Sequence, residues 1–147
     1  MSFSLKNRVV LFDTMLLIYL FEDVAPFAAK CEALFERVRN GELKGIITPI
    51  TMAELVVKPL AKGRSDIAES YRLALENFPN LQLFSITPAI GTMAGALRAK
   101  YKLPLPDLFQ VASAMSTKAT LLTNDKALSR IEEIPVMLLD ICHGSPR

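Results

Sequence analysis

Short apolar runs recur along the chain and are separated by longer segments in which apolar and polar residues follow helical spacing. Runs of this length, rich in Val, Ile and Leu, are typical of strands buried on both faces of a sheet. The predicted strands are Arg8–Phe12, Lys44–Thr48, Leu81–Ser85, Ala119–Thr123 and Val136–Leu139.

Four of the intervening segments carry an apolar stripe that predicts an amphipathic helix. Pro26 lies in the first turn expected for the first helix, and Gly41 follows its end. Ser65 is a candidate cap of the second helix, and Thr87 with Pro88 opens the third. The inward-facing residues are Phe27, Cys31, Leu34, Phe35 and Val38; Ile67, Tyr71, Ala74 and Phe78; Ile90, Met93, Ala94, Leu97 and Tyr101; and Leu108, Val111, Ala112 and Met115.

Strands that alternate with helices predict an α/β fold with a central parallel sheet covered on both faces, a three-layer α/β/α sandwich. Right-handed crossovers place the carboxyl ends of the strands along one edge, where open α/β sheets bind their ligands. We expect a single domain over residues 1–147, with its core at about 8–139 and a C-terminal tail at 140–147.

The composition, 51% hydrophobic and 7% aromatic, excludes the disordered class and is compatible with an additional dimer or partner interface. A net charge of +2 does not by itself indicate nucleic-acid binding. Cys31 and Cys142 match no metal-binding spacing, so we expect two reduced thiols.

The first residues imitate a signal peptide, since Lys6 and Arg8 precede the apolar run Leu16–Phe21. Asp13 interrupts this apolar stretch, and Glu22 closes it before any cleavage pattern appears. The run is also shorter than the roughly 20 apolar residues that cross a bilayer. We therefore expect a soluble, cytoplasmic protein that does not associate with membranes.

Acidic residues stand at four places where the pattern predicts that a strand passes into a helix. If the strands are parallel neighbours, the four carboxylates converge on one rim of the sheet. The four are Asp13 after Val9–Phe12, Glu54 within Thr48–Glu54, Asp107 after Leu103–Pro106 and Asp125 after Leu121–Asn124.

Three of these acids also have purely structural interpretations. Thr51 and Glu54 have the spacing of a capping box, and for Glu54 taken alone this interpretation is favoured. Asp107 lies in a first helical turn, where the helix dipole favours a negative charge. Asp125 follows Asn124 in a sequence typical of a turn before a short helix.

Asp13 is harder to explain in this way, because apolar residues flank it on both sides and burial of a lone carboxylate is costly. Strand alternation places Arg8 on the far side of the run, and the next basic residue is Lys30. Converging carboxylates would also raise one another's pKa values. A hard divalent cation, Mg²⁺ or Mn²⁺, removes this repulsion, and no His or Cys cluster indicates zinc.

Four segments together resemble the PIN domain, and in particular the small VapC-like toxins, over about residues 8–139. The segments are Phe12–Thr14, Thr51–Leu55, Leu105–Ala114 and Leu121–Asp125, and their order and spacing carry the resemblance. The resemblance implies an α/β/α sandwich with Mg²⁺-dependent endoribonuclease activity. It makes Asp13 and Asp107 the principal Mg²⁺ ligands.

In the same resemblance Asp125 and Glu54 complete the metal site, directly or through water, and the hydroxyls of Thr14 and Thr123 orient carboxylates or water. The chain departs from the family at Met15, where a small polar residue is common. We expect the lost hydrogen bond to weaken metal affinity or activity by about 10-fold to 100-fold. A second departure, Leu128 in place of an aromatic residue, is interpreted as a packing change only.

Phosphates of an RNA substrate require cations around the acidic centre. For each cation taken singly, a solvated surface position is the plainer interpretation. Tyr101 could stack on a base, but its helical spacing from Leu97 favours a core position. The candidates are Lys58, Lys62, Arg64, Lys100, Lys102, Lys126 and Arg130.

The resemblance also implies a homodimer and a cognate antitoxin whose segment covers the acidic site, with Met15–Phe21 and Phe27–Val38 as docking surfaces. Two alternatives remain. A degenerate PIN domain would bind RNA or protein without cutting. A phosphate-accepting receiver domain also gathers acids at strand ends, but Leu138–Asp140 lacks the Lys expected at the end of its last strand.

Overall fold

The computed structural model describes residues 8–139; the predicted tail at 140–147 and Cys142 lie outside the described residues. Five strands and six α-helices alternate along this part of the chain, with one short 3₁₀ helix, η1. Their bounds are β1 (Val9–Phe12), α1 (Thr14–Phe21), α2 (Phe27–Arg39), β2 (Lys44–Ile47), α3 (Pro49–Ala61), α4 (Ser65–Glu76), β3 (Leu81–Leu83), α5 (Pro88–Lys100), α6 (Leu105–Thr117), β4 (Thr120–Thr123), η1 (Lys126–Arg130) and β5 (Val136–Leu138).

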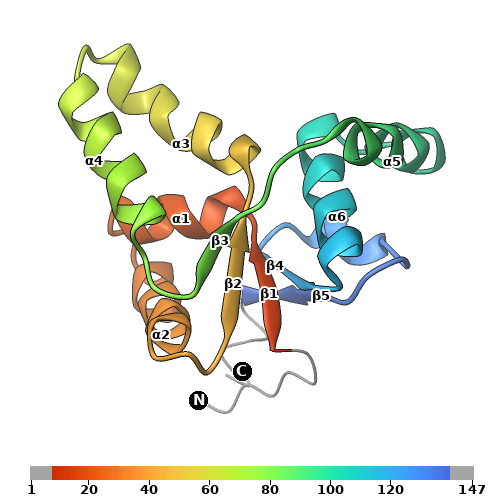
Figure 1. Cartoon of the computed structure of the whole chain (residues 1–147), viewed down its shortest axis with the longest axis horizontal. Coiled ribbons are helices and arrows are strands. Elements are labelled where there is room, and N and C mark those ends of the chain that lie inside the picture. Colours follow the sequence, from red (N-terminus) through yellow and green to blue (C-terminus); the bar gives the residue numbers. More distant parts are fainter. Residues whose placement is uncertain (1–7, 140–147) are drawn as a thin grey trace.

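The strands form one sheet in the order β3-β2-β1-β4-β5, and every neighbouring pair is parallel. Leu11 lies at the centre, paired with Ile46 on one side and Leu121 on the other. This arrangement confirms the predicted parallel sheet (Figure 1).

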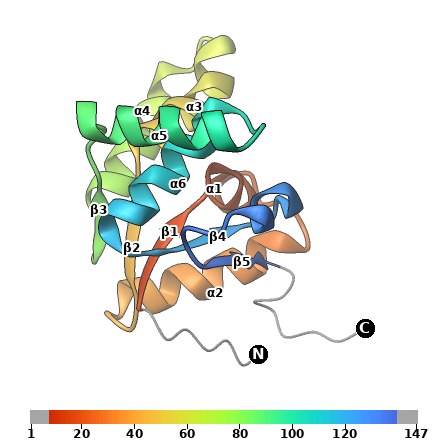
Figure 2. The same ribbon diagram turned by 90° about the vertical axis from the view of Figure 1, so that its right-hand side faces the viewer.

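Helices cover both faces of the sheet, which confirms the three-layer sandwich (Figures 1 and 2). Alternation along β1 sends Val10 and Phe12 into a core shared with α1 and α2, and sends Leu11 into a second core shared with α5 and α6. All three side chains are fully buried. No helix between residues 8 and 139 has both the length and the apolar character needed to cross a membrane.

The strand order reverses between β1 and β4. From β1 the chain builds outward through β2 to β3, and then returns through α5 and α6 to add β4 and β5 on the other side. At such a switch point the loops after the two central strands diverge to opposite faces and leave a crevice at the carboxyl edge of the sheet. Asp13 directly follows β1, and Thr123 is the last residue of β4.

Two helix starts differ from their predictions. The cap of α3 is Thr48, whose hydroxyl accepts the Ile50 N–H at 3.2 Å, so the expected capping box of Thr51 with Glu54 is wrong. Ser65 is the first residue of α4 rather than its cap, because the cap position is Arg64, which makes no side-chain capping bond.

The buried stripe of α4 also differs from the prediction. It is centred on Ala68 and Leu75, whereas the predicted Ala74 is exposed. The α4 helix packs on α3 at the margin of the molecule, away from the sheet centre, so only a narrow face of α4 is covered (Figure 1).

Asp107 does not follow a strand. It lies in the first turn of α6, which α5 and a short connection precede, and not β3. The prediction that all four acids stand at strand ends is therefore wrong for Asp107, which reaches the same rim through a helix N-terminus.

Candidate active site

Asp13 is the buried acid of the group, with a side chain that is 7% exposed at the end of β1. One carboxylate oxygen accepts the Thr14 N–H at 2.9 Å, which caps α1, and the other accepts the Thr123 hydroxyl at 2.6 Å. Burial raises the pKa of Asp13, and these two hydrogen bonds offset the rise only in part. No ion pair within residues 8–139 involves Asp13.

Thr123 connects two of the acids. Its hydroxyl donates to Asp13 and accepts the backbone N–H of Asp125 at 3.1 Å. Asp125 in turn caps η1, since its Oδ1 accepts the Ala127 N–H at 3.0 Å. The turn interpretation of Asp125 is thus confirmed, and the same turn fixes this carboxylate beside the end of β1.

Glu54 lies in the second turn of α3, and its Oε1 accepts the Thr14 hydroxyl at 2.6 Å. The carboxylate therefore faces the start of α1 instead of closing back on its own helix. Thr14 and Thr123, the two hydroxyl residues singled out in the sequence, each hold one of the predicted acidic side chains.

Asp107 is close enough to the other three acids for their negative charges to change its pKa. The pKa of this carboxyl is raised to about 6, first by burial and then by the negative charges of Asp13, Asp125 and Glu54. A position in the first turn of α6 favours the charged form, so burial and like charge outweigh the helix dipole here. The structure thus brings the four predicted acids into one electrostatic neighbourhood.

The side chains are not arranged as a formed metal site. Among residues 8–139, no three His, Cys, Asp or Glu side chains lie close enough together to hold a metal ion as they stand. Asp13 and Glu54 are turned toward the threonine hydroxyls. The donor chemistry nevertheless fits a hard divalent cation, because half-buried Asp107 has no hydrogen-bond or ion-pair partner among the described residues and its charge is disfavoured.

Met15 makes a contact that the sequence did not indicate. Its sulfur accepts the backbone N–H of Asn124 at 3.2 Å, and the Asn124 amide donates to the Tyr19 hydroxyl at 3.3 Å. Met15 therefore binds the loop between β4 and η1, while Asp13 receives its hydrogen bonds from Thr14 and Thr123.

Three buried polar residues lie behind Glu54: Thr48, Thr51 and Gln110. From the sequence, Thr51 was assigned only a capping role, and Thr48 and Gln110 were not assigned to the site. The Thr48 hydroxyl and the Gln110 amide bond to each other, and Gln110 also bonds to Thr51. The available signal was a Gln on the inward face of α6, between apolar Leu108 and Val111.

The candidate RNA-binding cations fall into two groups. Three are already paired at exposed positions: Lys58 with Glu22 at 3.0 Å, Arg64 with Asp66 at 2.8 Å, and Lys100 with Glu133 at 2.9 Å.

The other group has no ion pair within the described residues. It consists of Lys62, Lys102, Lys126 and Arg130, all exposed.

Tyr101 is 8% exposed and its hydroxyl donates to Glu133, so the prediction of a core residue is confirmed.

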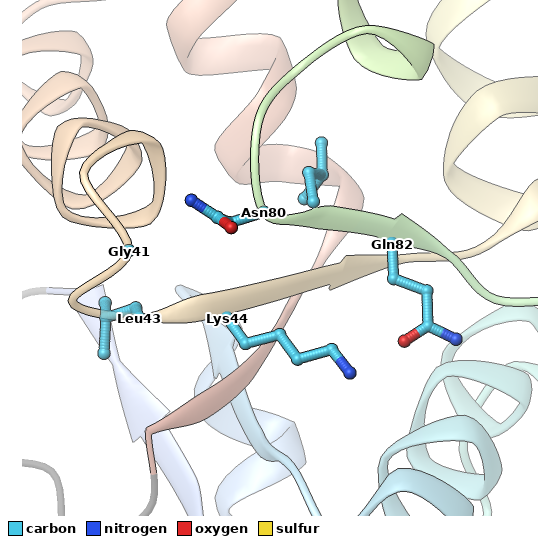
Figure 3. Close-up of a pocket in the computed structure, with 6 residues that line it drawn as sticks. Gly41, Leu43, Lys44, Asn80 and Gln82 are labelled. Atoms are coloured by element: carbon cyan, nitrogen blue, oxygen red, sulfur yellow. The ribbon is translucent and has the colours of Figure 1, made fainter.

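A hollow of about 390 Å³ lies at the other end of the sheet, where β2 and β3 begin (Figure 3). It is lined by Gly41, Leu43, Lys44, Asn80, Leu81 and Gln82. None of these residues is acidic, and the hollow is separated from the four acids by the length of the strands, so it does not belong to the candidate site.

The sequence pattern of the PIN domain matches residues 10–134. The chain therefore belongs to the PIN domain family, whose members are nucleases, and this indicates a hydrolase. No curated protein sequence matches the chain.

Several solved structures share the fold of this chain. A toxin–antitoxin complex from Klebsiella pneumoniae is similar to this chain, with 27% identity and a TM-score of 0.69, and the match covers 88% of this chain and 97% of the other. VapBC-1 from nontypeable Haemophilus influenzae has 21% identity and a TM-score of 0.68, with 90% and 98% covered. DNA-bound VapBC from Salmonella typhimurium has 15% identity and a TM-score of 0.71, with 88% and 97% covered. The PIN domain of this chain thus has the same fold as these structures.

Proposed function

We propose that the protein is a Mg²⁺-dependent endoribonuclease and the toxin of a toxin–antitoxin pair. The observation that carries this proposal is the placement of the four acids. Thr14 bonds to both Asp13 and Glu54, and Thr123 bonds to both Asp13 and Asp125. The negative charges of these three carboxylates add to burial in raising the pKa of Asp107. Such a concentration of negative charge at a topological switch point is stabilised by a divalent cation. Membership of a nuclease family supports hydrolysis as the reaction.

In this proposal Asp13 and Asp107 are the principal residues that hold Mg²⁺ or Mn²⁺, and Asp125 and Glu54 complete the site. When bound, the ion lowers the pKa of water and stabilises charge on phosphate oxygens. Thr123 holds the Asp13 carboxylate in place from β4. The burial of Asp13 strengthens its interaction with a cation, because solvent screens it little.

RNA is the proposed substrate, with Lys62, Lys102, Lys126 and Arg130 as the first candidates for phosphate contacts. The proposed partners are a cognate antitoxin and a second copy of the chain, in the cytoplasm. The antitoxin is supported by the similar structures, whose titles describe a toxin–antitoxin complex and VapBC assemblies.

The function is tested with purified protein and two oligonucleotides of one sequence, one RNA and one DNA. We expect cleavage of RNA with Mg²⁺ or Mn²⁺, no cleavage with EDTA, and recovery when the metal is restored. Intact RNA under every metal condition would contradict the proposal, and equal cleavage of DNA would contradict the substrate assignment.

A second candidate function is a degenerate PIN domain that binds RNA or protein without cutting. The observation in its favour is that no three acidic side chains among the described residues are arranged to hold a metal. Calorimetric titration with Mn²⁺ separates the two functions. The nuclease binds Mn²⁺ and loses this binding in Asp107→Asn, whereas the non-catalytic module binds RNA with no detectable Mn²⁺ binding.

A further inference from the structure

A continuous line of side-chain hydrogen bonds runs behind Glu54. The Thr48 hydroxyl donates to Gln110 Oε1 at 2.8 Å, and Gln110 Nε2 donates to the Thr51 hydroxyl at 2.8 Å. Thr51 Oγ1 lies 3.0 Å from Thr14 Oγ1, and the Thr14 hydroxyl donates to Glu54 at 2.6 Å. The line joins helices α3, α6 and α1 and ends on a carboxylate of the candidate site.

The direction of every bond in the line is determined by counting hydrogens. A carboxylate only accepts, so the single hydroxyl hydrogen of Thr14 is used on Glu54. Thr51 must then be the donor in its contact with Thr14. If the Gln110 amide were reversed, the Thr51 hydrogen would be needed for Gln110 and the contact with Thr14 would have none. All bonds are satisfied only when donation runs from Thr48 toward Glu54.

The line is closed off from water until its last member. Thr48, Thr51 and Gln110 are 0%, 0% and 1% exposed, and Thr14 is 6% exposed. A buried polar side chain that loses its partner destabilises the protein, so each member holds the next in place. Gln110 stands three residues after Asp107 on α6, so one helix carries both the acid and the amide.

We propose that Gln110 is a positioning residue for Glu54, acting through Thr51 and Thr14, in the nuclease reaction proposed above. Its amide fixes the donor direction of Thr51, which leaves the Thr14 hydroxyl only Glu54 as its acceptor. The side chain of Gln110 does not contact Glu54. Its effect on cleavage therefore exists only while Glu54 is present as a carboxylate.

The test is a double-mutant cycle of Gln110→Met and Glu54→Gln, with kcat and KM measured for RNA cleavage. Gln110→Met keeps the length of the side chain and removes both hydrogen-bonding groups. We expect it to lower kcat by about 10-fold with KM changed less than about 2-fold. In the Glu54→Gln background the same change should alter kcat less than about 2-fold. An equal effect in both backgrounds would overturn the proposal.

Matched variants separate positioning from a general loss of structure. Thr51→Val removes the donor at constant shape, and Thr51→Ser should recover most of the kcat that Thr51→Val loses. Ser113→Ala is the control on α6, since its buried hydroxyl donates only to Phe109 O, one turn back. It should leave kcat unchanged. A loss in Ser113→Ala as large as in Gln110→Met would overturn the proposal.

A measurement that needs neither metal nor RNA tests the hydrogen-bonded line even if the protein is not a nuclease. The ¹³C resonance of the Glu54 carboxyl is followed by NMR in the metal-free protein at fixed pH. We expect it to shift in Gln110→Met and Thr51→Val and to stay in place in Ser113→Ala. An unmoved resonance in Gln110→Met would overturn the proposal, whereas an absence of RNA cleavage by the wild type would overturn the function alone.

Discussion

The Thr123 hydroxyl donates to Asp13 Oδ2 at 2.6 Å and so ties the end of β4 to the end of β1. These strands are neighbours in the sheet but lie more than 100 residues apart in the chain, and between them the strand order reverses. The bond is buried, and it is made to a carboxylate whose ionised form is disfavoured by burial. The position of the most buried acid thus depends on a residue from the other half of the sheet.

Thr123→Val keeps the shape of this side chain and removes the hydroxyl. We expect RNA cleavage to fall by about 10-fold to 100-fold, because the Asp13 carboxylate loses the hydrogen bond that orients it. Chemical denaturation should show a loss of about 1–3 kcal/mol, as a buried acceptor is left with one partner fewer. Full activity in this variant would contradict the proposed role of Thr123.

The metal-free protein should become less stable as pH rises through about 6. The pKa of Asp107 is about 6 in the folded protein against an ordinary value of 3.8, so the folded state binds the extra proton between these values. The stability from this proton is complete below pH of about 4 and is lost above pH of about 6. Asp13 acts in the same direction, because its pKa is also raised.

Urea unfolding in EDTA at pH 5, 6 and 7 measures this dependence. Asp107→Asn should have a flatter profile than the wild type, since it removes one of the two groups responsible. The difference between the two proteins isolates Asp107 from the other acids. If the free energy of unfolding depended on pH equally in the two proteins, Asp107 would have its ordinary pKa, and burial and the other acids would not raise it.

Met15→Leu tests the sulfur contact to the loop that carries Asp125. Leu fills a similar volume and offers no acceptor for the Asn124 N–H. We expect a loss of about 0.5–1.5 kcal/mol in the free energy of unfolding and faster hydrogen exchange at Asn124. Unchanged exchange at this amide would mean that the sulfur does not hold the loop.

The unpaired cations should contribute more to RNA affinity than the paired ones. Lys126→Ala and Arg130→Ala, both in η1 beside Asp125, should each weaken binding and lower the slope of log affinity against log salt by about 0.7. Lys100→Ala serves as the comparison, because Lys100 is paired with Glu133. A larger slope change for Lys100 would reverse the assignment.

The sequence predicted the elements better than their spatial order. All five strands were found to within two residues at each end, because central strands buried on both faces read as continuous apolar runs. Leu81–Ser85 was too long, since β3 is an edge strand that ends at Leu83, where the side chain is already exposed. The reversal of order between β1 and β4 has no local signal, because it depends on how two distant halves pack.

Asp13 was noticed because a carboxylate inside an apolar run is unusual, whereas Glu54, Asp107 and Asp125 were selected by their positions where a strand was expected to pass into a helix. Thr14 and Thr123 were assigned through the resemblance to the family; Thr14 lies two residues after β1, and Thr123 is the last residue of β4. Gln110 was missed because it occupies the apolar face of a helix, where a polar residue has no meaning until Thr48 and Thr51 of α3 are placed against it.

The central claim is tested most directly by the rate of RNA cleavage by Asp13→Asn at saturating Mg²⁺. We predict a loss of at least about 100-fold in a variant that remains folded. Asn keeps the oxygen that accepts the Thr14 N–H and removes a charge that burial disfavours, while its NH₂ group replaces the oxygen that accepts from Thr123. Cleavage within about 2-fold of the wild-type rate would contradict the account, since the buried acid at the end of β1 would then have no part in the reaction.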